Sequence, residues 1–264
     1  MQIKSVSVIE HFDRIARDYR SLRVTDPEPV EYLAKLIRVG DPITNLLDIG
    51  CGTGRYIEVL LDRLHTPVNL CCLDLSNKML SVCRKVLANH SKTKSCCFIK
   101  CSANSISFKQ DVFDCVITFN AIHHFDLSKF LSEVILTLKE NGILAIYTRS
   151  RAQNENTIWG KFFPKFSQKE TRLFSIDEFE NIIYQNPRLD LEEIKIYNFE
   201  RLNTLAQLIK SISNHHYSTF EYYTPEKLAK ASIVFENRLR KIYGKHKIPH
   251  VSRYTLYILR KKRA

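Results

Sequence analysis

Short apolar runs alternate, through residues 45–148, with segments whose apolar residues recur at helical spacing. The runs predict buried strands at 45–48, 69–75, 98–103, 114–119 and 143–148. Helical spacing predicts helices at 56–64, 78–89 and 127–141, with Gly142 as the C-cap of the last one. Strands that alternate with helices in this way indicate an α/β fold.

The flanking segments add helices and two further strands. We expect helices at 11–22 and 30–39, separated by a break before Pro29, which suits an early helix position. Residues 149–174 have no clear period, so we predict a long loop that acts as a lid or docking segment. Ser175 begins a further helix with a box-like start. The remaining expected elements are strands at 191–199 and 252–260 and a helical insertion at 202–250.

A glycine-rich turn follows the first strand. Residues 48–54 read D-I-G-C-G-T-G, and alternate glycines let a backbone bend tightly and approach a ligand closely. The dinucleotide fingerprint G-x-G-x-x-G needs a glycine at position 55, where this chain has Arg55. Asp74 ends the second strand, where an acid can accept both hydroxyl hydrogens of a ribose. The alternative is that Asp74 caps the following helix.

The turn and its following segments resemble the class I S-adenosylmethionine (SAM)-dependent methyltransferases, in particular methyltransferase domains of the type 11/25 kind. Their first motif reads D-x-G-x-G-x-G, and the resemblance covers about residues 40–150. It implies a Rossmann-like, mostly parallel seven-stranded sheet with an antiparallel last strand, which residues 252–260 would supply, and a C-terminal helical lid. We expect a single domain, 1–264, with a helical cap (1–40), a SAM-binding core (41–150) and lid and final strands (151–264).

The resemblance also implies a set of SAM-binding residues. Asp48 would hold turn amides or the amino group of the methionine moiety, and Asp74 the ribose. Many family members have an aspartate at position 102, so Ser102 leaves the contact to the adenine amino group open. The residues implied to bind the cofactor are Tyr19, Arg23, Asp48, Gly50, Cys51, Gly52, Gly54, Asp74, Leu75, Ser102, Ala103 and Asn120.

Two further residue groups are candidates for the chemistry. His123 and His124 follow the fourth strand, where a histidine can act as a general base near neutral pH; they can equally be structural. Trp159, Tyr217 and Arg149 are expected to line a substrate pocket over the carboxyl edge of the sheet. The alternative is that these aromatic residues form the core of the insertion.

Charge and cysteine content restrict the function classes. The net charge is +12, and residues 201–264 hold fourteen Lys and Arg against three Glu. That excess can attract phosphates or form a solvated helix face. No apolar run reaches membrane-span length, no C-x-x-C pair occurs among the eight cysteines, and neither a metal nor a membrane is expected. Reduced cysteines and a cytoplasmic location fit this composition.

Three functions therefore remain open. The first is methyl transfer from SAM to a small molecule enclosed by the aromatic lid. The second is RNA methylation, because G-C-G-x-G-[KR]-Y and the paired histidines are similar to wobble-uridine tRNA methyltransferases and the C-terminal quarter is basic. The third is a SAM-binding protein that has lost catalysis and acts through a partner.

Overall fold

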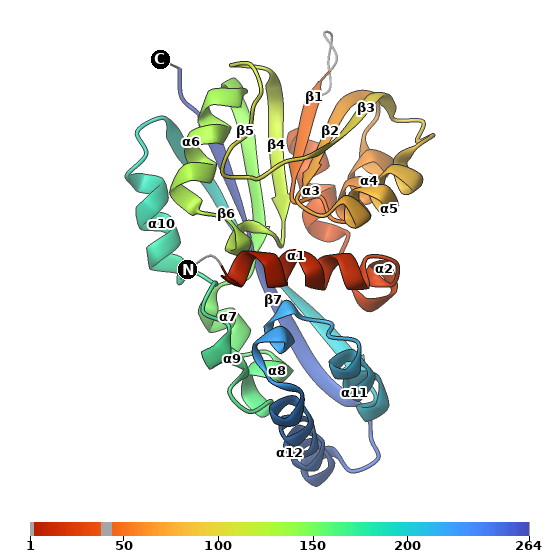
Figure 1. Cartoon of the computed structure of the whole chain (residues 1–264). Helices are drawn as coiled ribbons and strands as arrows, with labels where there is room; N and C mark the ends of the chain where they lie inside the picture. The colour runs from red at the N-terminus through yellow and green to blue at the C-terminus, as the bar shows by residue number, and fades with distance from the viewer. Residues whose placement is uncertain (1–2, 38–43, 264) are drawn as a thin grey trace.

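The computed structural model describes residues 3–37 and 44–263, and its strands form one sheet. The strands are β1 (Asn45–Ile49), β2 (Val68–Asp74), β3 (Thr93–Lys100), β4 (Phe113–Phe119), β5 (Leu138–Thr148), β6 (Leu189–Asn203) and β7 (Ile248–Lys261). Their order across the sheet is β3-β2-β1-β4-β5-β7-β6 (Figure 1). The pairs among β1 to β5 are parallel, and β7 runs antiparallel between β5 and β6. The predicted Rossmann-like α/β fold with an antiparallel last strand is confirmed.

Helices cover both faces of this sheet. Apolar side chains of α3 (Glu28–Leu36), α4 (Arg55–Arg63) and α5 (Asn77–Leu87) pack on one face. Those of α6 (Leu127–Thr137) and α10 (Ile176–Tyr184) pack on the other, beyond the 3-10 turn η1 (Ile122–His124). The apolar stripes of these amphipathic helices make two cores, one on each side of the buried strands.

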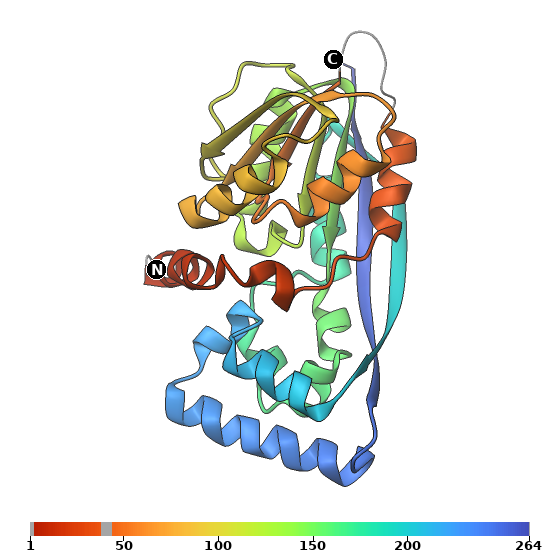
Figure 2. The ribbon, with the colours of Figure 1, turned by 90° about the vertical axis from the view of Figure 1, so that its right-hand side faces the viewer.

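A third apolar core lies beyond the carboxyl edge of the sheet. It is built mainly from α8 (Ile158–Phe162), α9 (Phe166–Lys169), α11 (Leu205–Ser213), η2 (Ser218–Tyr222) and α12 (Pro225–Tyr243), and α7 (Arg151–Glu155) lies against α8 and α9. Figures 1 and 2 show β6 and β7 extending past the other strands to reach these lid helices. Buried aromatic residues dominate this core, among them Trp159, Phe163, Phe220 and Phe235.

The N-terminal helices lie between the sheet and the lid helices (Figure 2). The helix α1 (Ile3–Ile15) contacts α5 through Ser76, whose hydroxyl bonds to Asp13, and contacts η2 through His11, whose Nδ1 lies 2.9 Å from the Glu221 carboxylate. The short helix α2 (Tyr19–Leu22) follows. Together, α1 and α2 cover the edge of the sheet at which β1 and β4 end. None of the helices formed by the described residues has the length and apolar composition of a membrane span.

Two predictions about local structure are wrong. Residues 149–174 form three short helices instead of a long loop, and a capping box between Ser150 and Gln153 begins the first of them. These helices have four or five residues each, too few for a period to show. Gly142 lies inside β5 and is no C-cap, because α6 already ends at Thr137.

The prediction that all cysteines are reduced is also wrong. A disulfide joins Cys71 on β2 to Cys97 on β3, and the two residues are register partners in neighbouring parallel strands. Their sequence separation of 26 residues carries no signal of this pairing, because it depends on the register of the two strands.

Candidate functional site

The three glycines of the turn after β1 have different surroundings. All three have a positive φ, between 55° and 75°, a backbone conformation that residues with a Cβ rarely adopt. A Cβ on Gly50 would lie 2.5 Å from the Cβ of Ala121, and one on Gly54 would lie 2.8 Å from the sulfur of Cys83. Packing therefore accounts for these two glycines without a ligand. A Cβ on Gly52 would meet nothing within 4 Å, so the turn is open to a ligand at Gly52.

Two carboxyl groups flank this opening. Asp74 accepts hydrogen bonds from the backbone N–H groups of Gly52, at 2.9 Å, and Ser76, at 2.8 Å. The N-cap of α5 is Ser76, so the alternative helix-capping role for Asp74 is wrong. Burial raises the pKa of Asp74 to about 6 despite these two bonds. Asp48 is 2% exposed, and its Oδ1 has no hydrogen-bond partner among the described residues.

The unpaired oxygen of Asp48 fits a missing ligand group. Burial raises the pKa of Asp48 well above its usual value, and the neighbouring Cys83 and Asp74 add to the shift. A positively charged amino group beside Asp48 would favour the ionised carboxylate and satisfy its oxygen. The turn thus offers an ammonium site at Asp48, an open surface at Gly52 and a hydroxyl acceptor at Asp74, which together suit SAM.

Leu75, Ser102 and Ala103 lie at the ends of β2 and β3. Leu75 is 42% exposed, which is unusual for a large apolar residue directly after a buried strand. Ala103 is buried, and the Ser102 hydroxyl accepts a hydrogen bond from the backbone N–H of Asn104. An apolar ring beside Asp74 would therefore find apolar contacts, whereas the Ser102 hydroxyl is already engaged in its own turn.

The loop after β4 brings Asn120 and the paired histidines to the other side of the turn. Asn120 has a φ of 56°, and its backbone N–H bonds to the Tyr147 carbonyl. His124 accepts a hydrogen bond from Arg172 through Nδ1 at 3.2 Å and packs edge-on against Phe12 of α1. The Nδ1 of His123 has no partner among the described residues. His124 is thus held by Arg172 and Phe12, whereas the buried Nδ1 of His123 has no such contact.

A cavity of about 830 Å³ opens beside this loop, beneath α1, α2 and the lid helices. It brings together residues predicted as cofactor contacts, as catalytic histidines and as substrate contacts: Tyr19, Arg23, Asn120, His123, His124, Arg149, Trp159 and Tyr217. A volume of this size is within the range of small-molecule sites, roughly 300–1,000 Å³.

Burial and neighbouring arginines determine the pKa of His123 in the cavity wall. Burial lowers the pKa of His123 well below its usual value, and the positive charges of Arg172, Arg23 and Arg149 lower it further. His123 is therefore neutral at physiological pH.

Trp159 contacts the cavity mainly from within the third core. It is 5% exposed and stacks on Phe235, with ring centroids 5.1 Å apart. The alternative that the aromatic residues form the core of the insertion therefore describes Trp159 well. Tyr217 is half-buried and lies against two arginines, Arg23 and Arg149, so it is closer to a pocket residue.

The sequence did not single out two other residues of the cavity wall. Arg55, 9% exposed, donates hydrogen bonds to the Val24 carbonyl and the Thr25 hydroxyl, and so ties the start of α4 to the segment after α2. Tyr254 on β7 packs against Arg149, whose guanidinium carbon lies 4.5 Å from the ring centroid. Alternation along the predicted last strand places Tyr254 on one sheet face, but only the strand order puts that face beside Arg149.

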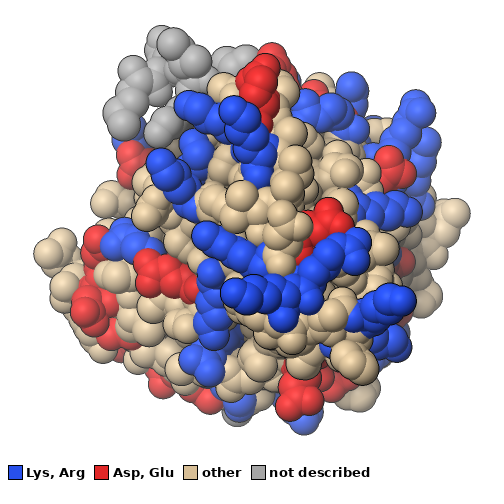
Figure 3. Space-filling view, turned by 90° about the horizontal axis from the view of Figure 1, so that it is seen from below, with Lys and Arg blue, Asp and Glu red and all other residues tan. Residues whose placement is uncertain are grey.

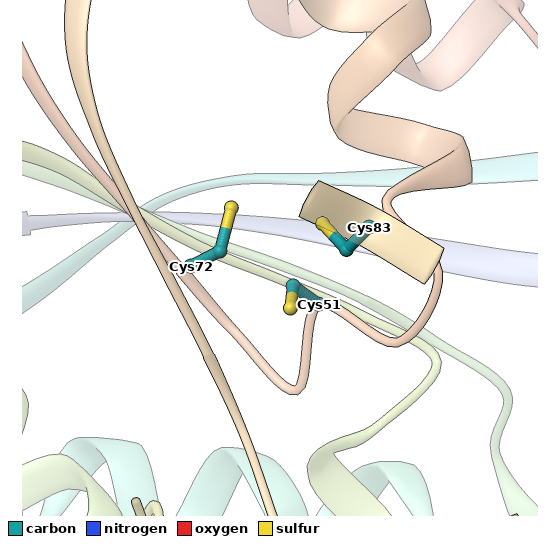
Figure 4. Close-up of side chains that lie close together, drawn as sticks. All are labelled: Cys51, Cys72 and Cys83. Atoms are coloured by element: carbon teal, nitrogen blue, oxygen red, sulfur yellow. The ribbon is translucent and has the colours of Figure 1, made fainter. Parts of the chain in front are cut away.

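Three cysteines form a cluster directly behind the glycine turn. The sulfur atoms of Cys51, Cys72 and Cys83 come from the turn, β2 and α5 and lie within 4.8 Å of one another (Figure 4). Within residues 3–37 and 44–263 this is the one group of His, Cys, Asp and Glu ligand atoms close enough to hold a metal ion. The cluster fills the space under the turn, and the expectation of no metal stays a prediction.

The basic excess of the C-terminal quarter is partly neutralised by acids elsewhere. Arg201, Arg260, Lys261 and Lys262 form ion pairs with Asp26, Glu192, Asp111 and Asp190. Figure 3 shows the lower face of the molecule, where Lys and Arg are interspersed with acidic and uncharged side chains. Several Lys and Arg side chains adjoin one another across the middle of this face, with acidic side chains beside them.

Comparisons with known proteins agree with this geometry. Residues 47–146, which include the end of β1, the glycine turn, Asp74 and the loop after β4, match the family model of a methyltransferase domain. The chain therefore carries a methyltransferase domain, and its fold is that of the class I SAM-dependent methyltransferases. Members of this family use SAM as the methyl donor.

This methyltransferase has both small-molecule and tRNA enzymes among its relatives. It is 27% identical over 186 residues to the ubiquinone/menaquinone biosynthesis C-methyltransferase UbiE of Wigglesworthia glossinidia brevipalpis, covering 69% of this chain and 70% of the relative. It is 31% identical over 144 residues to the tRNA (carboxymethyluridine(34)-5-O)-methyltransferase alkbh8 of Xenopus tropicalis, covering 52% of this chain and 20% of the relative.

A solved structure with the same fold is the geranyl diphosphate C-methyltransferase of Streptomyces coelicolor, bound to Mg²⁺, geranyl diphosphate and S-adenosylhomocysteine. Its TM-score is 0.55 and its identity 16%, covering 89% of this chain and 78% of that protein.

Proposed function

We propose that this methyltransferase transfers a methyl group from SAM to a small-molecule acceptor held in the 830 Å³ cavity. The proposal rests on one observation: the opening at the glycine turn and the cavity lie next to each other. The opening at Gly52 and Asp48 fits the cofactor, and the cavity begins at Arg55 and Asn120, directly beside the glycine turn.

The cofactor side of this junction uses residues after three strands. We assign the amino group of the methionine moiety to Asp48, the ribose hydroxyls to Asp74 and the adenine to the apolar surface of Leu75 and Ala103. Gly52 gives the backbone its close approach, and Tyr19 of α2 closes over the site. These roles rest on the orphaned oxygen of Asp48 and on the exposure of Leu75.

The chain's own contribution to catalysis is alignment and exclusion of water. When bound, SAM supplies a methyl group already activated by the positive sulfur. The nucleophile's electron pair forms the new bond to the methyl carbon as the carbon–sulfur bond breaks, so the chain has to hold the acceptor in line. A neutral acceptor also releases a proton, and we propose the neutral His123, whose buried Nδ1 has no partner among the described residues, as its acceptor.

RNA methylation remains the second candidate, favoured by the tRNA methyltransferase relative. Against it, four of the basic C-terminal residues already pair with acids. The cavity between α1 and the lid helices suits a compact acceptor better than a polynucleotide. A non-catalytic SAM-binding role is the third candidate and predicts cofactor binding without turnover.

Calorimetric titration with S-adenosylhomocysteine and with NAD tests the cofactor part of the proposal. We expect micromolar binding of S-adenosylhomocysteine and none of NAD. Gly52→Val should abolish binding, because a β-branched side chain would fill the space over the turn. Gly244→Val is the matched control: Gly244 also has a positive φ and open space, but it ends α12, far from the turn in sequence. Equal binding by the two variants would contradict the assignment of the turn.

A further inference from the structure

Arg149 is a buried cation without an acid partner. It follows β5, is 6% exposed, and forms no ion pair with any residue in the described ranges. Its Nε and Nη2 have no hydrogen-bond partner there. A buried charge that lacks such partners destabilises a fold unless something else supplies them. Because the guanidinium lines the cavity, a bound molecule can be that partner.

A second cation, Arg23, lies near the aromatic ring of Tyr217, which Arg149 also faces. The guanidinium carbon of Arg23 lies 4.5 Å from the ring centroid of Tyr217, and that of Arg149 lies 5.9 Å from it. The Nε of Arg23 also lacks a partner among the described residues. Burial alone raises the pKa of Tyr217, but the positive charges of Arg149 and Arg23 outweigh burial and lower it below its usual value. Two cations thus converge beside Tyr217.

The other arginines around the cavity are already engaged. Arg201 pairs with Asp26, Arg14 pairs with Glu221, and Arg55 donates to the segment after α2. Within the described residues, the cavity wall carries six Lys and Arg but only two acids: Arg14, Arg23, Arg55, Arg149, Arg201 and Lys210 against Asp18 and Glu170. The free guanidinium donors are therefore concentrated at Arg149 and Arg23.

The position of Arg149 separates it from the cofactor. The glycine turn follows β1, and Arg149 follows β5, two strands further along the order β1-β4-β5. At about 4.8 Å per strand, the two positions are about 10 Å apart across the sheet. One strand, β4, therefore separates Arg149 from the strand that carries Asp48, at which we place the methionine moiety.

We propose that the methyl acceptor carries an anionic group, a carboxylate or a phosphate, which Arg149 and Arg23 bind. Guanidinium groups bind both anions through paired, charge-assisted hydrogen bonds. The rings of Tyr217 and Tyr254 would flank the uncharged part of the acceptor. The inference rests on the proposed function, because it takes the cavity to be the acceptor site. The bound anion would also offset the charges that lower the pKa of His123 and so make His123 a better proton acceptor.

Charged and neutral ring compounds of similar shape test this inference. Benzoate and phenyl phosphate are titrated against benzamide and phenol at constant ionic strength, with S-adenosylhomocysteine saturating. Trp159, the sole tryptophan, lines the cavity and reports binding by its fluorescence. We expect an anion to bind at least about tenfold more tightly than its neutral counterpart, which corresponds to about 1.4 kcal/mol. Preference for phenyl phosphate indicates a phosphorylated acceptor, and preference for benzoate a carboxylate.

Substitutions test which residues cause the preference for anions. Arg149→Gln should remove the preference for the anion and leave the affinity for S-adenosylhomocysteine within about twofold, because Arg149 lies about 10 Å from the turn. Arg23→Gln serves as a second variant if Arg149→Gln melts early. Arg253→Gln, on the exposed side of β7 and outside the cavity wall, is the matched control and should behave as the wild type.

The two proposals fail in different ways. If S-adenosylhomocysteine binds but anions and neutral compounds bind equally, or Arg149→Gln and Arg23→Gln both keep the preference, the anion site is overturned and the proposed function stands. If S-adenosylhomocysteine does not bind and the anion preference still depends on Arg149, the anion site stands and the proposed function is overturned.

Discussion

Replacing Asp74 with asparagine keeps the shape of the side chain and removes its charge. In the free protein its two oxygens accept from the backbone of Gly52 and Ser76, and both keep lone pairs for the ribose hydroxyls. Hydrogen bonds to a charged group contribute about 1.5–3 kcal/mol, against about 1 kcal/mol for neutral ones. We therefore expect the affinity for S-adenosylhomocysteine to fall by about 1–3 kcal/mol, which is about 5-fold to 150-fold.

The pKa of Asp74 adds a pH dependence to this prediction. Burial raises it to about 6 in the free protein, and the ribose hydroxyls prefer the ionised form. The affinity should thus be constant above pH 7 and fall as pH drops through 6, approaching a tenfold loss per pH unit because one proton is taken up. The asparagine variant cannot take up this proton, so its affinity should fall less than that of the wild type as pH drops from 7 to 5; the remaining fall comes from Asp48, whose pKa burial also raises.

Calorimetry at several pH values measures both effects, and melting curves confirm that each variant is folded. Asp190→Asn is the control, since Asp190 is exposed and pairs with Lys262 at the far end of β6. Unchanged affinity in the Asp74 variant at pH 7.5 would remove Asp74 from the ribose role. A wild-type affinity that stays constant down to pH 5 would refute the argument from the raised pKa.

Two further predictions concern the acceptor side. Neutralising the exposed Lys241, Lys245 and Lys247 together should leave methyl transfer to a small molecule nearly unchanged, because exposed charges are screened beyond about 8 Å at physiological salt; a salt-sensitive RNA shift in a gel, lost in this triple variant, would favour RNA instead. Trp159→Ala should destabilise the protein by about 3–5 kcal/mol through the third core. The melting temperature of this variant should therefore fall sharply. A normal melting curve together with lost turnover would instead indicate that Trp159 contacts the substrate.

The sequence predicts the sheet well where burial leaves a clear pattern. The strands that end at Ile49 and Asp74 are covered on both faces, so they read as continuous apolar runs between turn residues. The lid helices were harder to predict from the sequence, because α7, α8 and α9 are too short for a helical period of apolar residues to show. The starts of α7 and α8, though not that of α9, do carry capping residues, Ser150 and Thr157, that could have indicated them.

The site was predictable in its cofactor half and much less so in its acceptor half. Asp48 and the glycines lie close together in sequence, so a local motif identifies them. Arg149 could be named as a donor near the edge of the sheet. Its lack of a partner, however, depends on residues from β7 and η2 that only the folded chain brings next to it. The same holds for the disulfide between β2 and β3, which depends on strand register.

The most direct test of the account is transfer of a labelled methyl group. The protein is incubated with methyl-labelled SAM and either a cell's small metabolites or its RNA, and the product is separated by size. The account predicts label in a small, anionic product, absent when Gly52→Val is used and present with Gly244→Val. Label in RNA, or no transfer to either pool by a protein that binds S-adenosylhomocysteine, would contradict it.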